Sequence, residues 1–204
     1  MTPSATAAAA PKTPHTLATL FGSVARETVL RVFMLDPLRA YYQRQIEGAT
    51  NLSIRAVQRE LERLASIELL YRHEEGNRAY YQVDMSFPLF PELRSIVLKT
   101  SSPADRLRGE LAIDESVELA FLCEAEGRAL MVLSGDVRPG LAAPNGYTLE
   151  VMSMDAFERA LAESPDELAP FLDRGVDLLG RRDDVVWRRI AAAGFHVEKG
   201  AGVP

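Results

Sequence analysis

The apolar residues of the first fifty positions recur every three or four residues, the period of helices packed on a core. Over residues 16–35 this period predicts one amphipathic helix, which Pro37 closes. Residues 37–50 predict a second, shorter helix, with either Tyr41 or Tyr42 facing inward. The chain therefore opens with helices.

A third helix and a β-hairpin follow. The predicted helix covers Ser53–Leu64, and Ser53 stands in the N-cap position. Two strand-like runs, Ile67–His73 and Arg78–Val83, then surround the turn sequence Glu-Glu-Gly-Asn. Helices followed by a β-ribbon are the order of a winged helix–turn–helix, in which the third helix enters the major groove and the ribbon meets the adjacent backbone.

The exposed face of the third helix carries the candidate base-reading side chains, which are Ile54, Arg55, Gln58, Arg59 and Glu62. Arginine can bond the O6 and N7 atoms of guanine in two-pronged fashion, and glutamine can do the same with N6 and N7 of adenine. We therefore expect this face to contact DNA bases. The alternative is an ordinary solvated face.

Further polar side chains flank the ribbon and the helix ends. Arg72, Asn77 and Arg78 lie at the ribbon tip, where they would meet phosphates or a narrow minor groove. Arg44 and Ser53 lie near helix ends from which they could contact the DNA backbone. Plain capping or solvation is the alternative for these two residues.

Four motifs in order carry a resemblance to a known family: "LFGS..R..VL", "LS..AVQRELERL", "GNR.YY" and "PLFPELR.IVLKT". Over roughly residues 17–108 the chain resembles the ArsR-type winged-helix regulators that are fused to a minimal nucleotidyltransferase-like domain. The resemblance implies a transcriptional regulator that acts as a homodimer on double-stranded DNA. Our leading hypothesis is a repressor, and an activator is the alternative. Such a dimer would read an imperfect palindrome.

The pair Gly22-Ser23 raises an alternative, because nucleotidyltransferases hold a triphosphate on a Gly-Ser turn. That turn follows a strand and is itself followed by an Asp-x-Asp motif that binds Mg²⁺. Here the pair lies inside a predicted helix, and the sequence after it reads Asp36-Pro37-Leu38. The second and third helices also lack Cys and His, so we expect no metal-sensing site of the ArsR type.

Behind the hairpin, the pattern predicts a helical run over residues 87–112, which Ser101-Ser102-Pro103 interrupts. A small α/β unit follows, in which Asp155 stands as the N-cap of a helix. We interpret the helix over 87–112 as a linker and dimerisation element. The expected fold class is thus α+β, with a disordered leader at 1–15, a winged helix–turn–helix at 16–86, and a nucleotidyltransferase-like domain at 113–204.

The C-terminal part departs from the catalytic pattern of the family it resembles. Glu124 and Glu126 stand where a triphosphate would bind, and Ala129-Leu130-Met131-Val132 replaces the carboxylate pair. Glu150 is a single remaining acid, and one acid cannot hold two metal ions. We therefore expect no enzyme activity and no cofactor. The alternative functions are an active nucleotidyltransferase that modifies a partner, or an adaptor that binds proteins. The candidate partner of the C-terminal domain is a small effector or a protein.

Charge separates the two parts. Residues 1–111 hold 14 Lys and Arg against 12 Asp and Glu, a net charge of +2, whereas residues 112–204 hold 9 against 17, a net charge of −8. Only the front part suits phosphate. Cys123 is the one cysteine, which excludes an intramolecular disulfide, and the chain has no membrane-spanning window or secretory signal pattern. We expect a cytoplasmic protein.

Overall fold

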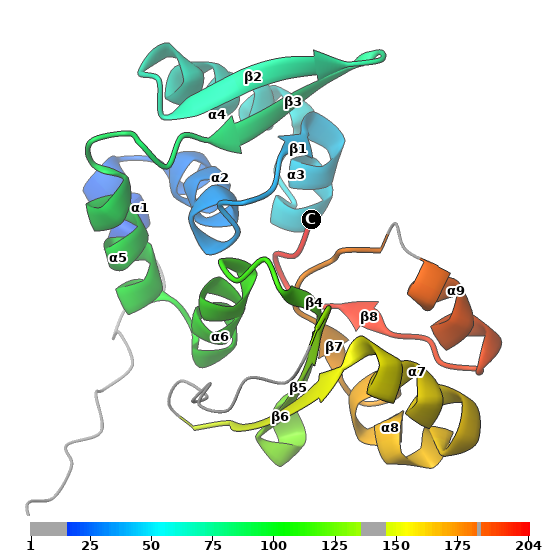
Figure 1. Ribbon diagram of the computed structural model, residues 1–204. Helices are drawn as coiled ribbons and strands as arrows, with labels where there is room; N and C mark the ends of the chain where they lie inside the picture. The colour runs from blue at the N-terminus through cyan, green and yellow to red at the C-terminus, as the bar shows by residue number, and fades with distance from the viewer. Residues whose placement is uncertain (1–15, 136–145, 183–184) are drawn as a thin grey trace, which may run out of the picture.

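The computed structural model describes residues 16–135, 146–182 and 185–204 (Figure 1). The chain folds into helices and two small sheets, so the predicted α+β class is confirmed. The predicted leader, residues 1–15, lies outside the described residues. In the described part, no helix is both long and apolar enough to cross a bilayer.

The segment predicted as one helix over residues 16–35 is two helices, α1 (Thr16–Phe21) and α2 (Val24–Leu35). Gly22 has a φ of 68°, a conformation that glycine adopts at little cost, and it ends α1. Ser23 then caps α2, because its hydroxyl oxygen accepts a hydrogen bond from the backbone N–H of Arg26 at 3.2 Å. The prediction of a continuous helix was wrong because the Gly-Ser pair both stops and restarts the helix.

The prediction of a helix over residues 37–50 was wrong in its first part. A short strand, β1 (Tyr41–Tyr42), precedes α3 (Gln43–Thr50) and pairs antiparallel with the hairpin. Tyr41 is buried, and its hydroxyl donates to Oδ2 of Asp36 at 2.8 Å. Burial and the neighbouring Asp36 raise the pKa of Tyr41, so this hydroxyl keeps its proton.

The third helix and the hairpin both form, but their bounds differ from the prediction. The strand predicted over Ile67–His73 begins at Leu70 and extends to Glu75, so Glu74 and Glu75 belong to the strand and the turn is formed by residues 76–77. The hydroxyl oxygen of Ser53 accepts from the backbone N–H of Ala56 at 3.4 Å and caps α4 (Ile54–Ser66), which confirms the predicted cap. The hairpin strands are β2 (Leu70–Glu75) and β3 (Arg78–Val83). Together with β1 they form a sheet of order β1-β3-β2.

The predicted linker segment forms two helices, α5 (Phe90–Thr100) and α6 (Pro103–Ala112), and the break at Ser101 and Ser102 confirms the predicted interruption. The apolar side of α5 packs on α1–α4 and the hairpin in the first core. The apolar side of α6 packs on the second sheet instead. In Figure 1, α6 lies between the first half of the molecule, which contains α1 to α5 and the three-stranded sheet, and the second half, which contains the elements from β4 (Val117–Cys123) to β8 (Glu198–Lys199).

Gly109 brings α6 close to the first half. A Cβ atom at this position would lie 2.6 Å from Cδ2 of Leu98 and 3.3 Å from Cδ2 of Leu35. Leu98 belongs to α5 and Leu35 ends α2. Glycine thus allows α6 to pack tightly on two helices of the first half while its other side covers the second sheet.

The second half contains a five-stranded sheet of order β6-β5-β4-β7-β8. Its elements in chain order are β4 (Val117–Cys123), the 3₁₀ turn η1 (Glu124–Glu126), β5 (Arg128–Leu133), β6 (Thr148–Ser153), α7 (Met154–Glu163), α8 (Pro165–Leu172), β7 (Val176–Asp177), α9 (Val185–Ala192) and β8 (Glu198–Lys199). Helix α6 covers one face of this sheet and α7–α9 cover the other, so both faces are buried. The predicted cap of α7, Asp155, was wrong, because the Ser153 hydroxyl oxygen accepts the capping bond from Ala156.

Candidate nucleic-acid interface

Helix α4 has one buried and one exposed face. Val57, Leu61 and Leu64 pack into the first core. The five side chains singled out on the opposite face, at positions 54, 55, 58, 59 and 62, are all exposed. The periodic pattern of the sequence therefore placed both faces correctly.

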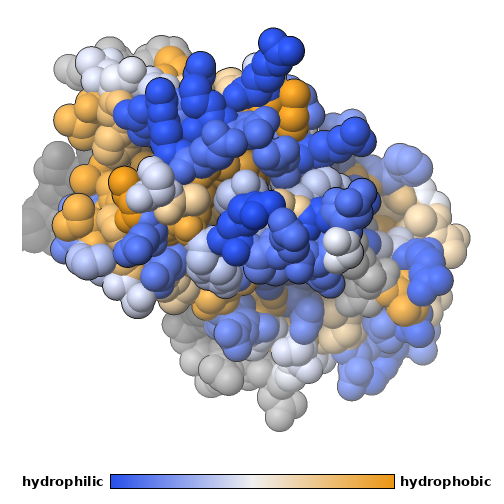
Figure 2. Space-filling view, turned by 90° about the horizontal axis from the view of Figure 1, so that it is seen from above, coloured by the Kyte–Doolittle hydropathy of each residue, from blue (hydrophilic) through white to orange (hydrophobic). Residues whose placement is uncertain are grey.

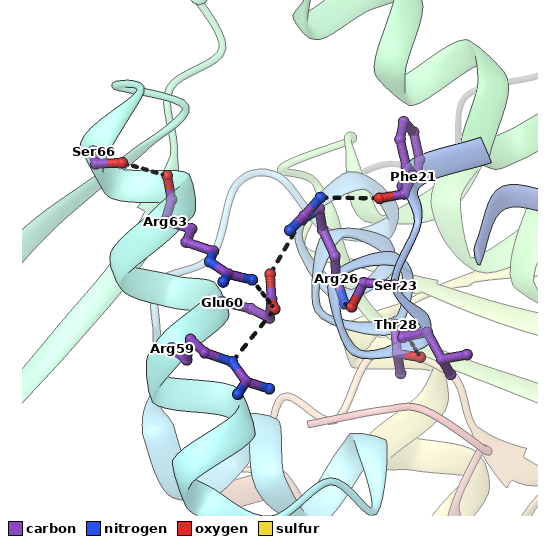
Figure 3. A network of polar contacts seen from close by, with 9 residues as sticks. Phe21, Ser23, Arg26, Thr28, Arg59, Glu60, Arg63 and Ser66 are labelled. Carbon is purple, nitrogen blue, oxygen red and sulfur yellow. Dashed lines mark hydrogen bonds and ion pairs between the residues drawn. The ribbon is translucent and has the colours of Figure 1, made fainter. Parts of the chain in front are cut away.

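A buried carboxylate attaches α4 to α2 (Figure 3). Glu60 is 1% exposed, and its oxygens contact Nε of Arg26 at 3.2 Å and Nη1 of Arg63 at 2.9 Å. Nε of Arg59 lies farther away, at 3.8 Å. Arg26 also donates to the backbone oxygen of Phe21 at 2.9 Å. These contacts fix α4 against the turn between α1 and α2, and no local pattern in the sequence signals the pairing of residues 26 and 60.

The two arginines predicted to read bases differ in their surroundings. Arg59 is 61% exposed at its side chain but lies beside the Glu60 carboxylate. Arg55 is exposed near the start of α4, and within the described part of the chain it makes no hydrogen bond or ion pair. Its guanidinium group is thus free to bind an external acceptor.

A groove of about 730 Å³ lies between α4, the start of α3 and the hairpin. Six of the predicted site residues line it: Arg44, Gln58, Glu62, Arg72, Asn77 and Arg78. Three arginines face one glutamate there, so the lining is cationic. Ser53, Ile54, Arg55 and Arg59 lie outside it, on the remaining exposed surface of α4. Figure 2 shows this side of the molecule, where hydrophilic side chains gather over α4 and the hairpin.

Local contacts preorganise the groove. Gln58 donates to Glu62 at 3.0 Å, and Nη2 of Arg72 contacts Glu74 at 2.6 Å. The guanidinium carbon of Arg78 lies 4.7 Å from the centre of the Tyr42 ring, a cation–π contact. Because such contacts hold long side chains in place, less rotamer freedom is lost when a ligand binds.

Tyr42 is a groove residue that the helical prediction for residues 37–50 missed. It lies in β1 opposite Tyr80, and the two rings meet edge to face with centroids 5.7 Å apart. On the neighbouring strand the His73 ring stacks on Tyr80 at 5.6 Å. Two consecutive tyrosines favour a strand over a helix, and this preference was the available signal.

The second half places its candidate acid in an ion-pair cluster. Glu150 on β6 lies opposite β5 and contacts Arg128 Nη2 at 2.7 Å, while Glu126 contacts Arg128 Nη1 at 3.1 Å. The bonds to Glu150 and Glu126 raise the pKa of Arg128. Arg174 also reaches Glu126, at 2.6 Å. Among the described residues, no group of three or more His, Cys, Asp or Glu side chains is placed to hold a metal ion.

Comparison with protein families, curated proteins and solved structures gives no match.

Proposed function

We propose that the protein is a sequence-specific, DNA-binding transcriptional regulator of the winged helix–turn–helix type, acting as a homodimeric repressor. The observation that supports this proposal is the cationic groove between α4 and the hairpin, which collects Arg44, Arg72 and Arg78 beside the exposed face of α4. Phosphate contacts from such residues would position the protein, and contacts to base edges would specify the site.

In the proposed complex, α4 is the recognition helix and lies in the major groove. Arg55 and Arg59 reach guanine edges, and Gln58 reaches adenine. One DNA strand then runs through the groove between α4 and the hairpin, where its phosphates meet Arg44, Arg72 and Arg78. Asn77 and Arg78 at the hairpin tip form the wing.

A homodimer fits the apolar residues that α1, the end of α4 and the loop before α5 leave exposed. Leu20, Ile67, Met85 and Leu89 are 67%, 55%, 44% and 56% exposed. In Figure 2 apolar colour gathers on one side of the molecule. A two-fold pair that buried such a surface would present two α4 helices to two half-sites. Both helices of the predicted dimerisation segment pack inside the subunit, α5 in the first core and α6 on the second sheet, so the exposed residues just named are the proposed contact surface.

The second half, in this proposal, is a nucleotidyltransferase-like domain without catalytic activity. Arg128 bridges Glu126 and Glu150, so its guanidinium group already neutralises the acid that a metal ion would need.

Selection of duplexes from a random library, followed by fluorescence anisotropy, tests the proposal. We expect one enriched site, bound by two chains. Arg55→Ala and Arg59→Ala should each reduce the binding free energy for that site by about 1–3 kcal/mol, with little change in the affinity for scrambled DNA. Arg78→Ala should weaken binding to both the selected and the scrambled duplex, and it should reduce the slope of log K against log salt by about 1.

Arg188→Ala is the matched control, because Arg188 is an exposed arginine on α9 in the second half. It should leave both affinities unchanged. A library that yields no enriched sequence, or variants at positions 55 and 59 that bind like the parent protein, would contradict the proposal.

A further inference from the structure

A second, smaller cavity lies where the two halves of the molecule meet. Its volume is about 230 Å³, and α2, α3, α6 and the segment after β8 contribute its walls. The polar side chains in its lining are those of Thr28, Arg31, Thr50, Asp105 and Arg108. It is separate from the groove at α4, since the two share no lining residue.

Arg108 is the unusual residue in this cavity. It is 1% exposed, and Nη1 donates to the backbone oxygen of Gly202 at 2.7 Å. Nε and Nη2 are buried and have no hydrogen-bond partner in the described part of the chain. Buried donors almost always have partners, because leaving one unsatisfied is energetically unfavourable. The free edge of the guanidinium group therefore lacks an acceptor.

The neighbouring acids do not provide that acceptor. Asp36 is buried, and its Oδ2 accepts from the Tyr41 hydroxyl, while its Oδ1 lies 3.9 Å from Nη2 of Arg181 and has no hydrogen-bond partner in the described part of the chain. Asp36 makes no hydrogen bond or ion pair to Arg108 there. Glu27 is bound to Arg31 at 2.6 Å, and Arg31 also donates to the Ser101 hydroxyl at 2.7 Å. Arg31 thus has acceptors within the chain, whereas the free edge of Arg108 has none among the described residues.

The cavity also offers acceptors. The hydroxyl of Thr50 donates to the backbone oxygen of Ile46 at 2.6 Å, and that of Thr28 donates to Val24 at 2.8 Å. Since their protons are used, both hydroxyls can only accept from a ligand, and the Thr50 oxygen already accepts from the backbone N–H of Leu52 at 3.4 Å. Asp105, half-buried on the same helix as Arg108, adds a carboxylate. The lining thus combines a cationic fork with anionic and neutral acceptors.

We propose that this cavity binds a small α-amino acid, whose carboxylate accepts from Nε and Nη2 of Arg108 and whose ammonium group donates to Asp105 and the threonine hydroxyls. A two-oxygen anion matches the paired N–H groups of a guanidinium edge. At about 30 Å³ for each water-sized group, the volume holds roughly eight such groups, which corresponds to an amino acid up to the size of valine.

Calorimetric titration of the full-length protein tests this site with the amino acids from glycine to valine. For the ligand that binds, two analogues define the chemistry: the carboxylic acid without the amine, and the amide without the carboxylate. We expect both analogues to bind at least tenfold more weakly than the amino acid. Binding of none of these amino acids, or equal binding of the acid without the amine, overturns the proposal.

Variants test the named side chains. Arg108→Met should abolish binding. Asp105→Asn should lower the affinity for the amino acid at least fivefold and raise the affinity for the acid that lacks the amine. Glu110→Gln is the matched control, because Glu110 is exposed on α6 and does not line the cavity. Unchanged affinity in folded Arg108→Met contradicts the assignment.

A further variant keeps the test decisive if Arg108→Met fails to fold. Ala201→Leu places a larger side chain at the cavity from an exposed position and leaves α6 untouched. With its fold checked by circular dichroism, it should lose at least tenfold in affinity. Parent-like binding by this variant would place the ligand elsewhere and overturn the proposal.

Discussion

Glu60 divides the arginines of α4 into two groups. Arg63 and, at a longer distance, Arg59 share its carboxylate with Arg26 of α2, whereas Arg55 stands apart near the start of the helix. A carboxylate that is 1% exposed needs such partners, because an unpaired buried charge is costly. One residue therefore holds α4 in place and also limits how far Arg59 is available to an external acceptor.

Glu60→Gln tests the structural part of this role. The variant keeps the shape of the side chain and removes the charge that three guanidinium groups share, so we expect a loss of about 1.5–3 kcal/mol in the free energy of unfolding. Urea denaturation measures it. Glu62→Gln, on the exposed face of the same helix, should change stability by less than about 0.5 kcal/mol. Equal losses in the two variants would show that the network contributes nothing to stability.

At the scale of elements, periodicity predicted type and order well and boundaries less well. The cap at Ser53, the buried stripe of α4 and the hairpin could all be predicted, because capping, helical period and turn residues are local signals. The break at Gly22 and the strand β1 were missed, since a positive φ and a pairing with β3 depend on the fold around them.

The candidate site divides in the same way. Which side chains of α4 are exposed follows from its helical period. That Arg44 and Tyr42 share a groove with the hairpin does not, because the groove forms only when β1 pairs with β3. The Glu60 network joins residues 34 positions apart and has no local signal.

Gly76 and Gly48 both have free space around them, but we expect a Gly→Ala change to have opposite effects on stability at the two positions. Gly76 makes the hairpin turn with a φ of 58°, whereas Gly48 lies inside α3 without a positive φ. A Cβ atom added at either position would meet no neighbouring atom within 4 Å. Gly76→Ala should destabilise the protein by about 1–2 kcal/mol, and Gly48→Ala should stabilise it by about 0.5–1 kcal/mol. Thermal and urea unfolding measure both, and effects of the same sign would contradict the assigned backbone geometry.

At the scale of the whole molecule, α6 joins the two halves. Leu107 and Leu111 pack on the second sheet, Gly109 contacts α2 and α5, and Arg108 bonds the segment after β8. Arg181 adds contacts from the second half to the backbone oxygen of Ala112 and to Asp36. Both halves thus pack on α6, and removing this helix would expose apolar residues in each of them.

We therefore expect the protein to unfold in one cooperative transition. Scanning calorimetry should give a single peak whose calorimetric and van't Hoff enthalpies agree. Leu107→Ala, at a fully buried position, should shift the whole peak to lower temperature, corresponding to a loss of about 2–5 kcal/mol in the free energy of unfolding. Two separate peaks, of which the variant shifts only one, would show that the halves unfold independently.

The position of α6 also restricts which recombinant proteins are sensible. A fragment that ends after α5 would leave Leu35 and Leu98 without the helix that covers them, and one that includes α6 alone would expose the apolar side of that helix to water. Grafting the first half, α1 to α5, onto a foreign partner would meet the same difficulty. Any chimaera that contains α6 should therefore also contain the strands that this helix covers.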